Sequence, residues 1–339
     1  MTETQSNLDR LVALTRGFRT TQATYVFAKL GLADELAAGP ATAAELAQKV
    51  DVNADALARV LRLDAFCELV TEVPGDRFEL TAVGNLLRTG VEGSLKAHAI
   101  MVGEQHYIAW GSLLYSVRTG EPAFDHVFGS PFFDYMAKDP DAQATFDAAM
   151  SSGSDLYLAP LADAYDFRAR TLVDVGGGNG SLSAIILKRH PQVEAVIYDQ
   201  PQVLEAADRY LTDAGLRERC RLVPGNFFES VPEGGDVYFL SNIVHDWDDE
   251  RAVQILKNCR AAMNPTAVVL LLEAVMPEHG TPPEAAMFDV NMLVLLTGKE
   301  RTRTQFESLL RAAGLRLEKV TPVSKTESLI EARPLQAVS

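Results

Sequence analysis

The sequence of 339 residues predicts an α/β fold, in which a mostly parallel sheet of seven strands follows an α-helical N-terminal part. Two patterns favour this fold class. From residue 170 onward, short apolar runs that suit strands alternate with helical patterns, as in a parallel sheet covered on both faces. Before that, residues 8–88 show the helical spacing of apolar side chains, interrupted by one hairpin pattern. The length exceeds that of a usual single domain, so we expect more than one.

The N-terminal part carries clear start signals for helices. Thr42 and Glu45 form a capping-box pattern, which predicts a helix over residues 43–50, and a second helix follows it. A small hairpin comes next, with strands at 69–73 and 78–80 joined by a Pro-Gly-Asp turn. Two short helices and a hairpin in this order predict a winged-helix module.

A winged helix can bind DNA or pack against a partner, and the charge favours the second role here. Between residues 41 and 70, three basic residues stand against five acidic ones: Lys49, Arg59 and Arg62 against Glu45, Asp51, Asp55, Asp64 and Glu68. The formal net charge of −15 opposes binding to nucleic acid or to an acidic membrane surface. No run approaches the roughly 20 apolar residues of a membrane span. We therefore expect neither nucleic acid nor a membrane as a partner.

The segment 92–165 is rich in aromatic residues and largely helical in pattern. We expect it to link the two halves of the chain and to wall a pocket. The sequence thus predicts three parts: a winged-helix domain at 1–91, a helical linker at 92–165, and the domain with the parallel sheet at 166–339.

The sheet domain is predicted element by element from residue 171. Strands are expected at 171–175, 193–198, 221–224, 236–240, 267–273, 315–320 and 328–331, and helices begin near Ser181, Val203, Asp249, Pro283 and Thr304. Thr304 and Glu307 repeat the capping-box pattern. Ligands of such sheets bind beyond the carboxyl ends of the strands. The candidate residues at this edge are Gly176, Asp199, Asn226, Ser241 and Glu273.

The glycine-rich turn after the first strand indicates the kind of ligand. Residues 172–180 read L-V-D-V-G-G-G-N-G; glycines let the backbone turn tightly and approach a ligand, and the next helix offers unpaired N–H groups. The dinucleotide fingerprint needs its third glycine at position 181, where Ser181 stands, so the pattern disfavours a pyrophosphate. Asp199 ends the next strand, where a carboxylate can accept both ribose hydroxyls. These features fit an adenosine without phosphates, and S-adenosyl-L-methionine is such a molecule.

A histidine and two glutamates are predicted to meet at the same edge. His245 directly follows a strand, Glu273 ends the next strand, and Glu300 lies in a loop before the last helix. A carboxylate that accepts from Nδ1–H fixes the tautomer, leaves Nε2 to accept a proton and raises the pKa of the histidine. The alternative for Glu300 is a surface ion pair with Arg301 or Arg303.

The cysteines and the first residues indicate the compartment. Cys67, Cys220 and Cys259 are odd in number and far apart, which fits neither a disulfide framework nor a metal-binding spacing. We expect reduced, mostly buried thiols, and no metal is implied. The first ten residues are polar and lack the apolar segment of a secretion signal, so we expect a cytoplasmic protein.

Five stretches occur in order along the chain: L-V-D-V-G-G-G-N-G, Y-D-Q-P, P-G-N-F-F, S-N-I-V-H-D-W-D-D-E and G-K-E-R-T. With the winged-helix start and the closing S-L-I-E-A, they resemble the plant-type (class I, S-adenosylmethionine-dependent) O-methyltransferase family and its bacterial natural-product branch. The resemblance covers nearly the whole chain. It implies a Rossmann-like sheet domain, S-adenosyl-L-methionine as cofactor, S-adenosyl-L-homocysteine as product, and a homodimer that interlocks through its N-terminal parts.

The resemblance also implies a role for each matching position. His245 would be the general base, and Glu273 and Glu300 would orient it. The cofactor would contact Gly176 and Gly178 with its amino-acid end, Asp199 with its ribose, Asn226 and Phe227 with its adenine, and Ser241 with its methionine side. The positions that match acceptor contacts are Phe146, Met150, Asn242, Asn291 and Met292.

Some of these positions have a plainer interpretation or depart from the family pattern. Phe146 and Met150 lie four residues apart on one helical face, which ordinary core packing also explains. Asn226 stands where the family often has an aspartate, so a charge is lost while an acceptor for the adenine amine is kept. Gly298 is a single glycine where relatives often have two, and the register of Glu300 depends on it.

The sequence therefore predicts methyl transfer to a phenolic hydroxyl of an aromatic small molecule in secondary metabolism. Alternatives within the same fold are methylation of carbon or nitrogen and cofactor-assisted decarboxylation or hydroxylation. A transcription factor that senses a metabolite is a further alternative, which the acidic charge opposes. The last is a nicotinamide-dependent oxidoreductase, which the early third glycine opposes.

Overall fold

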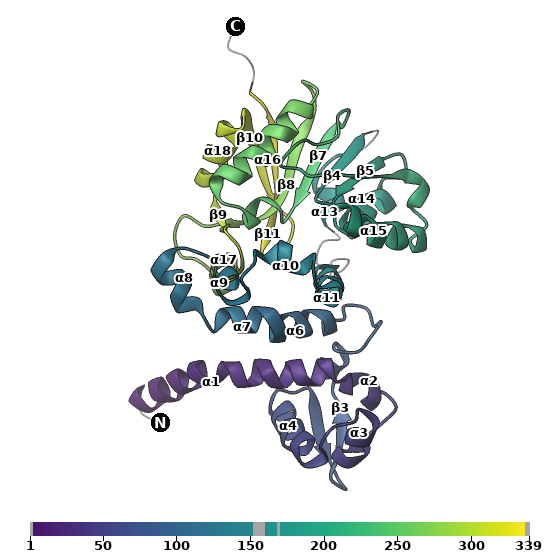
Figure 1. The fold of residues 1–339 in the computed structure, drawn as a ribbon, viewed down its shortest axis with the longest axis vertical. Coiled ribbons are helices and arrows are strands. Elements are labelled where there is room, and N and C mark those ends of the chain that lie inside the picture. The colour runs from purple at the N-terminus through teal and green to yellow at the C-terminus, as the bar shows by residue number, and fades with distance from the viewer. Residues whose placement is uncertain (1–2, 152–159, 168–169, 336–339) are drawn as a thin grey trace. The chain divides into compact units, whose positions relative to one another are not determined.

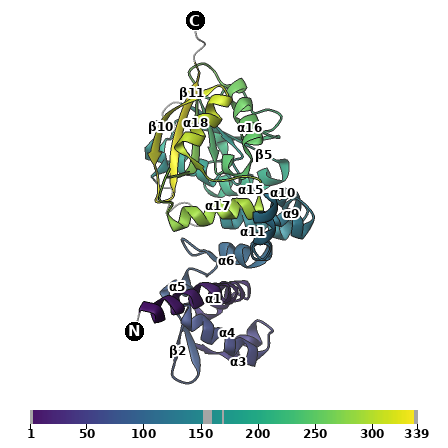
Figure 2. The same ribbon diagram turned by 90° about the vertical axis from the view of Figure 1, so that its left-hand side faces the viewer.

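The computed structural model describes residues 3–151, 160–167 and 170–335 (Figures 1 and 2). The chain divides into two compact units. The N-terminal unit comprises Met1–Gly111 and Met136–Gly153, and the C-terminal unit comprises Ser112–Tyr135 and Ser154–Ser339. The predicted linker at 92–165 is therefore shared between the two units.

The N-terminal unit contains the helices and the hairpin that the sequence predicts. The capping box of Thr42 and Glu45 is confirmed, with Glu45 N–H donating to Thr42 Oγ1 at 3.2 Å. A short strand before it, which the sequence did not indicate, completes a three-stranded antiparallel sheet of order β1-β3-β2. The elements are α1 (Glu3–Lys29), α2 (Leu32–Leu36), β1 (Ala41–Thr42), α3 (Ala43–Lys49), α4 (Ala54–Phe66), β2 (Val70–Val73), β3 (Arg77–Leu80), α5 (Ala82–Asn85), α6 (Lys96–Met101), η1 (Val102–His106), α7 (Tyr107–Trp110) and α11 (Pro140–Ser151).

The core of this unit is formed by apolar side chains from α1 to β3, among them Phe27, Leu46, Leu61 and Phe78. The first half of α1 behaves differently, because its large apolar side chains are exposed in the single chain. These are Leu8, Leu11, Val12, Leu14 and Phe18, each at least 39% exposed. A helix with such residues in water usually has a partner surface.

The C-terminal unit is built on a mostly parallel sheet of order β10-β11-β8-β7-β4-β5-β6, with β9 paired to β8. The pairs from β8 to β6 are parallel, and β11 and β10 join antiparallel. The strands are β4 (Thr171–Val175), β5 (Glu194–Asp199), β6 (Cys220–Pro224), β7 (Val237–Ser241), β8 (Val268–Met276), β9 (Arg301–Thr302), β10 (Leu315–Pro322) and β11 (Glu327–Pro334). The predicted fold class is confirmed.

Helices cover both faces of this sheet (Figure 1). Side chains of α16 and α18 share one apolar cluster with the sheet, and those of α14 and α15 share the other. The helices are α8 (Leu113–Thr119), α9 (Ala123–Phe128), α10 (Phe132–Met136), α13 (Leu161–Ala164), α14 (Ser181–Arg189), α15 (Pro201–Asp213), η2 (Arg217–Arg219), η3 (Val244–Asp246), α16 (Asp249–Ala262), α17 (Pro283–Leu295) and α18 (Arg303–Ala312). The central strands β4, β7 and β8 are therefore buried on both sides, which explains their continuous apolar runs.

Two local predictions are wrong. The capping box of the last helix lies at Thr302 and Gln305 rather than at Thr304 and Glu307. Both pairs match the pattern, but β9 keeps the chain extended up to Thr302, so the helix starts two residues earlier than the second match requires. Strand β8 also runs on to Met276, so Glu273 lies within the strand.

The three cysteines are free, as expected. Cys220 begins β6 and Cys259 lies on α16, and both are buried in the core of the C-terminal unit, whereas Cys67 is half-buried. Within the described parts of the chain, no helix has the length and apolar character needed to cross a membrane.

Candidate active site

The glycine-rich turn between β4 and α14 has the backbone that its sequence demands. Gly176, Gly178 and Gly180 have φ angles of 75°, 56° and 76°, which lie in the left-handed region that other residues rarely adopt. A Cβ at Gly176 would also lie 2.5 Å from Ile243 Cδ1, so the Ile243 side chain would have to move to make room for it. The turn thus brings bare backbone to the carboxyl edge of the sheet.

Asp199 lies beside this turn at the end of β5. Its Oδ2 accepts from the N–H of Gly178 at 2.9 Å, and its Oδ1 accepts from the N–H of Gln200 at 2.7 Å. A carboxylate has about four acceptor positions, and these two bonds use two of them. The two backbone bonds hold the carboxylate in a fixed direction at the predicted edge.

Ser241, Asn226 and Phe227 complete this edge. Ser241 ends β7, and its Oγ is buried without a hydrogen-bond partner among the described residues, as expected of a group that meets a polar ligand. Asn226 Oδ1 accepts from the N–H of Phe228 at 3.0 Å. The Phe227 ring lies 4.9 Å from that of Phe228. Oxygens, bare backbone and apolar ring faces together fit an adenosine-containing sulfonium compound.

His245 lies in η3, directly beyond β7, with its side chain 12% exposed. Its Nδ1 is 2.8 Å from Glu300 Oε1 and 3.7 Å from Glu273 Oε2. The structure therefore brings together the histidine and both glutamates that the sequence singled out. Because Nδ1 faces two carboxylates, Nδ1 carries a proton.

The two glutamates are held by different partners. Glu273 is fully buried, and its Oε1 accepts from the N–H of Val244 at 2.8 Å. The N–H of Glu300 donates to Asp289 Oδ1 on α17 at 2.9 Å. The surface alternative for Glu300 is wrong, since Arg301 pairs with Asp249, and Arg303 pairs with Glu307 on α18.

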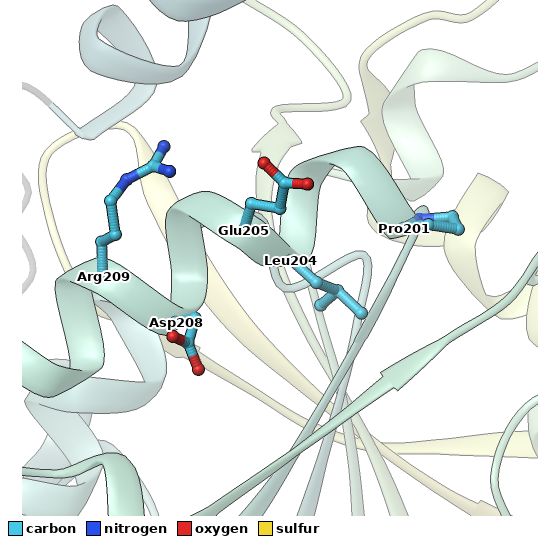
Figure 3. A pocket seen from close by; sticks show the side chains of 5 residues that line it. All are labelled: Pro201, Leu204, Glu205, Asp208 and Arg209. Carbon is cyan, nitrogen blue, oxygen red and sulfur yellow. The ribbon is translucent and has the colours of Figure 1, made fainter.

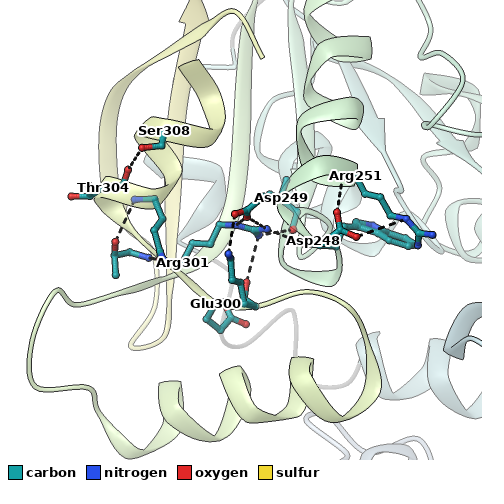
Figure 4. A network of polar contacts seen from close by, with 12 residues as sticks. Asp248, Asp249, Arg251, Glu300, Arg301, Thr304 and Ser308 are labelled. Carbon is teal, nitrogen blue, oxygen red and sulfur yellow. Dashed lines mark hydrogen bonds and ion pairs between the residues drawn. The ribbon is translucent and has the colours of Figure 1, made fainter. Parts of the chain in front are cut away.

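Arg301 ties the loop that carries Glu300 to the loop that carries His245 (Figure 4). Its guanidinium is fully buried and donates to the carbonyl oxygens of Val244 and Trp247, each at 2.8 Å. The same guanidinium makes two bonds to Asp249 Oδ1, at 3.0 and 2.8 Å. Both carbonyls flank His245 in sequence, so this one side chain fixes the two loops against each other.

A third carboxylate that the sequence did not single out also reaches the imidazole. Asp246 Oδ1 lies 3.4 Å from His245 Nε2. Burial lowers the pKa of His245, but the charges of Glu273, Asp246 and Glu300 outweigh it and raise the pKa to about 10. Burial in turn raises the pKa of Asp246 to about 6 and that of Glu273 to about 7. The acidic groups at both nitrogens thus favour the protonated imidazole.

Asn242 stands directly before this cluster, in the left-handed region at φ 52°. Its backbone N–H donates to the carbonyl of Leu272, and its Nδ2 donates to Glu327 Oε1 at 3.0 Å. Glu327 begins β11 and was not singled out by the sequence analysis. No short motif signals it, because its approach depends on β11 returning antiparallel beside β8.

The remaining candidate acceptor contacts are divided between the units. Asn291 and Met292 lie on α17, where Met292 is buried and Asn291 half-buried. Phe146 and Met150 lie on α11 in the N-terminal unit, with Met150 52% exposed. Their roles toward an acceptor stay predictions.

The same three residues, His245, Glu273 and Glu300, form the one group with metal-ligand spacing in the described parts of the chain. One ligand atom from each lies within 4.8 Å of the others. A metal bound through Nδ1 would have to replace the proton in the bond to Glu300. The spacing of these three residues alone would therefore allow a metal ion to bind. The expectation that the site works without a metal stays a prediction.

A surface hollow lies elsewhere, along one side of α15 (Figure 3). It is lined by Pro201, Leu204, Glu205, Asp208 and Arg209. All five come from a single helix and none is a candidate site residue, so this hollow does not compete with the edge of the sheet as the active site.

Comparison with known proteins agrees with this fold. Residues 110–316 match the O-methyltransferase domain, and residues 12–90 match the O-methyltransferase dimerisation domain. The chain is 42% identical over 326 residues to the phenazine O-methyltransferase PhzM of Lysobacter antibioticus, covering 96% of both chains. It is 41% identical to the 3-amino-4-hydroxybenzoate 4-O-methyltransferase of Streptomyces cremeus, covering 95% of this chain and 89% of that protein. Another relative, the phenazine-1-carboxylate N-methyltransferase of Pseudomonas aeruginosa, is 32% identical and covers 95% and 96%.

Solved structures show the same fold. LaPhzM, at 42% identity, superposes with a TM-score of 0.93 over 96% of this chain and 98% of that chain. The neocarzinostatin O-methyltransferase NcsB1, in complex with S-adenosylmethionine and 2-hydroxy-5-methyl naphthoic acid, is 34% identical, with a TM-score of 0.84 over 93% and 96%.

The fold and the matching domains show an S-adenosylmethionine-dependent transferase. More particularly, the chain belongs to the plant-type O-methyltransferase family, among its bacterial natural-product members.

Proposed function

We propose that this enzyme methylates a phenolic hydroxyl of an aromatic small molecule and that His245 is its general base. The observation that carries the proposal is the 2.8 Å contact between His245 Nδ1 and Glu300 Oε1. With Nδ1 engaged by Glu300, Nε2 would be the nitrogen that takes the proton of the acceptor. Relatives whose names state their acceptors support an aromatic one: a phenazine and an aminohydroxybenzoate.

The residues at the carboxyl edge would hold the cofactor. Asp199 would accept the ribose hydroxyls, Asn226 and Phe227 would meet the adenine, and the turn at Gly176 and Gly178 would approach the amino-acid end. Ser241 Oγ would meet the methionine side. When bound, S-adenosyl-L-methionine supplies a methyl group already activated on a sulfonium. The protein therefore has to align the acceptor oxygen and remove its proton, and alignment can supply roughly 7–11 kcal/mol.

The acidic surroundings of His245 match its proton affinity to that of a phenol. A phenol has a pKa of about 10, so transfer to an ordinary histidine near 6.5 would be uphill by roughly 4.8 kcal/mol. Glu273, Asp246 and Glu300 raise the pKa of His245 to about 10, which removes most of this difference. The base must first lose its own proton, so the same raised pKa makes its active form scarce at neutral pH.

Methylation of nitrogen is the second candidate, because two relatives are N-methyltransferases, at 36% and 32% identity. An aromatic nitrogen with a lone pair needs no base to attack a methyl group, whereas a phenol does. The buried set of one imidazole and three carboxylates therefore favours the hydroxyl. The chemical shift of the transferred methyl group separates the two products.

We also propose that the enzyme is a homodimer acting in the cytoplasm without a metal. The matching dimerisation domain and the exposed apolar side chains of α1 support the dimer. Activity that survives EDTA would support the absence of a metal.

The test begins with calorimetric titration of the protein with S-adenosyl-L-methionine, S-adenosyl-L-homocysteine and, as control, NAD. We expect binding of the first two alone. Methyl transfer from labelled cofactor to 2,3-dihydroxynaphthalene is then compared between wild type and His245→Ala. We expect turnover to fall about 10²- to 10⁴-fold while the cofactor Kd stays unchanged. An equal loss of cofactor affinity would contradict the assignment of His245 as the base.

A further inference from the structure

Glu327 is a half-buried carboxylate that the proposed mechanism does not use. It belongs to β11, while the Asn242 amide that it contacts follows β7, and β8 lies between these strands in the sheet. The contact therefore joins two segments about eighty residues apart across the end of β8. Burial raises the pKa of Glu327, and the bond from Asn242 opposes this rise. A group with this desolvation cost needs a compensating role.

The backbone around Glu327 is firmly held. Its carbonyl accepts from the N–H groups of Val323 and Ser324 at 2.9 and 3.1 Å, and its N–H donates to Ser324 Oγ at 3.0 Å. Its Cα pairs with that of Ala274 in the antiparallel ladder to β8. The carboxylate is thus presented from a rigid strand end.

This contact sets the direction of the Asn242 amide. The NH₂ group of Asn242 is the donor in this contact, so Oδ1 is the end of the amide that Glu327 does not use, and Oδ1 can only accept. The backbone of Asn242 is fixed as well, by the left-handed φ and the bond to Leu272. Oδ1 is therefore a preset acceptor, three residues before His245.

We propose that Glu327 is a positioning residue that turns the Asn242 amide so that its Oδ1 accepts a hydrogen bond from a second donor group of the methyl acceptor. This inference rests on the proposed function, in which Asn242 contacts the acceptor. It narrows the substrate class to aromatic molecules that carry a hydroxyl or amino group beside the hydroxyl that is methylated. Such a molecule would donate one hydrogen bond to Asn242 Oδ1 and give its other proton to His245. A phenol without the neighbouring donor would leave Asn242 Oδ1 without that bond.

The test uses binding, because binding does not depend on turnover. The Kd values of 2,3-dihydroxynaphthalene and 2-naphthol, which differ by one neighbouring hydroxyl, are measured by calorimetry on the full chain loaded with S-adenosyl-L-homocysteine. We expect wild type to prefer the diol by about tenfold, the size of one hydrogen bond to a preset group. Asn242→Ala should abolish the preference, and so should Glu327→Leu.

Glu327→Gln is the matched control, since its side-chain oxygen can still accept from Asn242 while the charge is lost. We expect this variant to keep the preference, with the diol Kd within about threefold of wild type. Equal preference in wild type and Glu327→Leu would overturn the proposal. So would a loss of affinity for both naphthols together in Glu327→Leu, because a merely structural role predicts that result. Failure of the proposed function shows separately, as absence of methylated product while cofactor and naphthols still bind.

Discussion

Glu273 and Glu300 both face the Nδ1 of His245, but they hold it in different ways. Oε1 of Glu300 lies 2.8 Å from Nδ1, whereas Oε2 of Glu273 lies 3.7 Å from it. The other oxygen of Glu273 accepts from the N–H of Val244. The bond to Glu300 sets the tautomer of the imidazole. Glu273 sets the backbone from which the imidazole projects.

Replacing the two glutamates should separate these tasks. Glu300→Ala removes the acceptor for Nδ1–H, and we expect kcat to fall about 10²-fold or more, as expected when a base loses the group that orients it. Glu273→Gln keeps an oxygen for the Val244 N–H, so we expect a loss below about tenfold. Steady-state kinetics at saturating cofactor measures both, with the cofactor Kd as control. A larger loss for Glu273→Gln than for Glu300→Ala would contradict this division.

The acidic setting of His245 predicts an unusual pH dependence. Its pKa is raised to about 10, so the neutral imidazole is scarce at pH 7 and grows about tenfold with each pH unit. We expect kcat/KM for a simple phenol to rise from about pH 6.5 to about pH 9 instead of levelling near 7. In Glu300→Gln, which removes one negative charge, the rise should level off at lower pH. A plateau by pH 7 in the wild type would show an ordinary imidazole.

The loop from Gly298 to Arg301 is the element that assembles the site. Gly298 lies against the backbone of the other loop, because a Cβ there would lie 1.8 Å from the His245 carbonyl oxygen. The N–H of Lys299 donates to that same carbonyl at 2.9 Å, and Arg301 binds the carbonyls on either side of it. Close backbone contact and a buried guanidinium together fix the register of Glu300.

Gly298→Ala should therefore open this contact. Since the atoms that would clash are backbone, the loops must move apart, and we expect kcat to fall more than tenfold and the Tm to drop by several degrees. Gly17→Ala is a matched control, because a Cβ at Gly17 meets nothing within 4 Å. Activity and thermal melts of both variants check the prediction, and wild-type behaviour of Gly298→Ala would refute it.

The sequence predicted most of the helices and strands, but it did not predict how the loops between them pack against one another. Strand and helix periodicity located β4 to β8 and the last hairpin. The signal is strongest for β4, β7 and β8, because mostly buried strands leave long apolar runs. The single Gly298 left the position of Glu300 open, since contact between two loop backbones has no periodic signal. Asp246 and Glu327 were missed for a similar reason: the first depends on the turn of η3, the second on the antiparallel return of β11.

The chain carries a strongly negative net charge, and the first half of α1 exposes apolar side chains. The net charge of −15 keeps chains apart at long range, so a stable pair needs an apolar contact to overcome it. The first half of α1 offers such a contact in the N-terminal unit. The exposed fraction of Leu14, the highest among the large apolar residues of α1, is 73%.

Leu14→Asp should weaken the dimer. A charge placed in an apolar contact loses its hydration without gaining a partner, and we expect the sedimentation profile to shift from dimer towards monomer. Asn7→Asp adds the same charge on the same helix at an exposed polar position and should leave the profile unchanged. An unchanged dimer in Leu14→Asp would place the interface elsewhere.

The alkylation rates of the buried cysteines should measure how often the core of the C-terminal unit opens. Burial raises the pKa of Cys259 to about 12 and that of Cys220 to about 11, so neither presents a thiolate to an alkylating reagent while the core is closed. Cys67, half-buried in the N-terminal unit, is the thiol that a reagent meets first. The rate at which iodoacetamide adds to Cys220 and Cys259 should therefore depend on how often the core around the sheet opens. If S-adenosyl-L-homocysteine slows this addition, the ratio of the two rates gives the degree to which the ligand stabilises the closed core. This experiment needs no methyl acceptor.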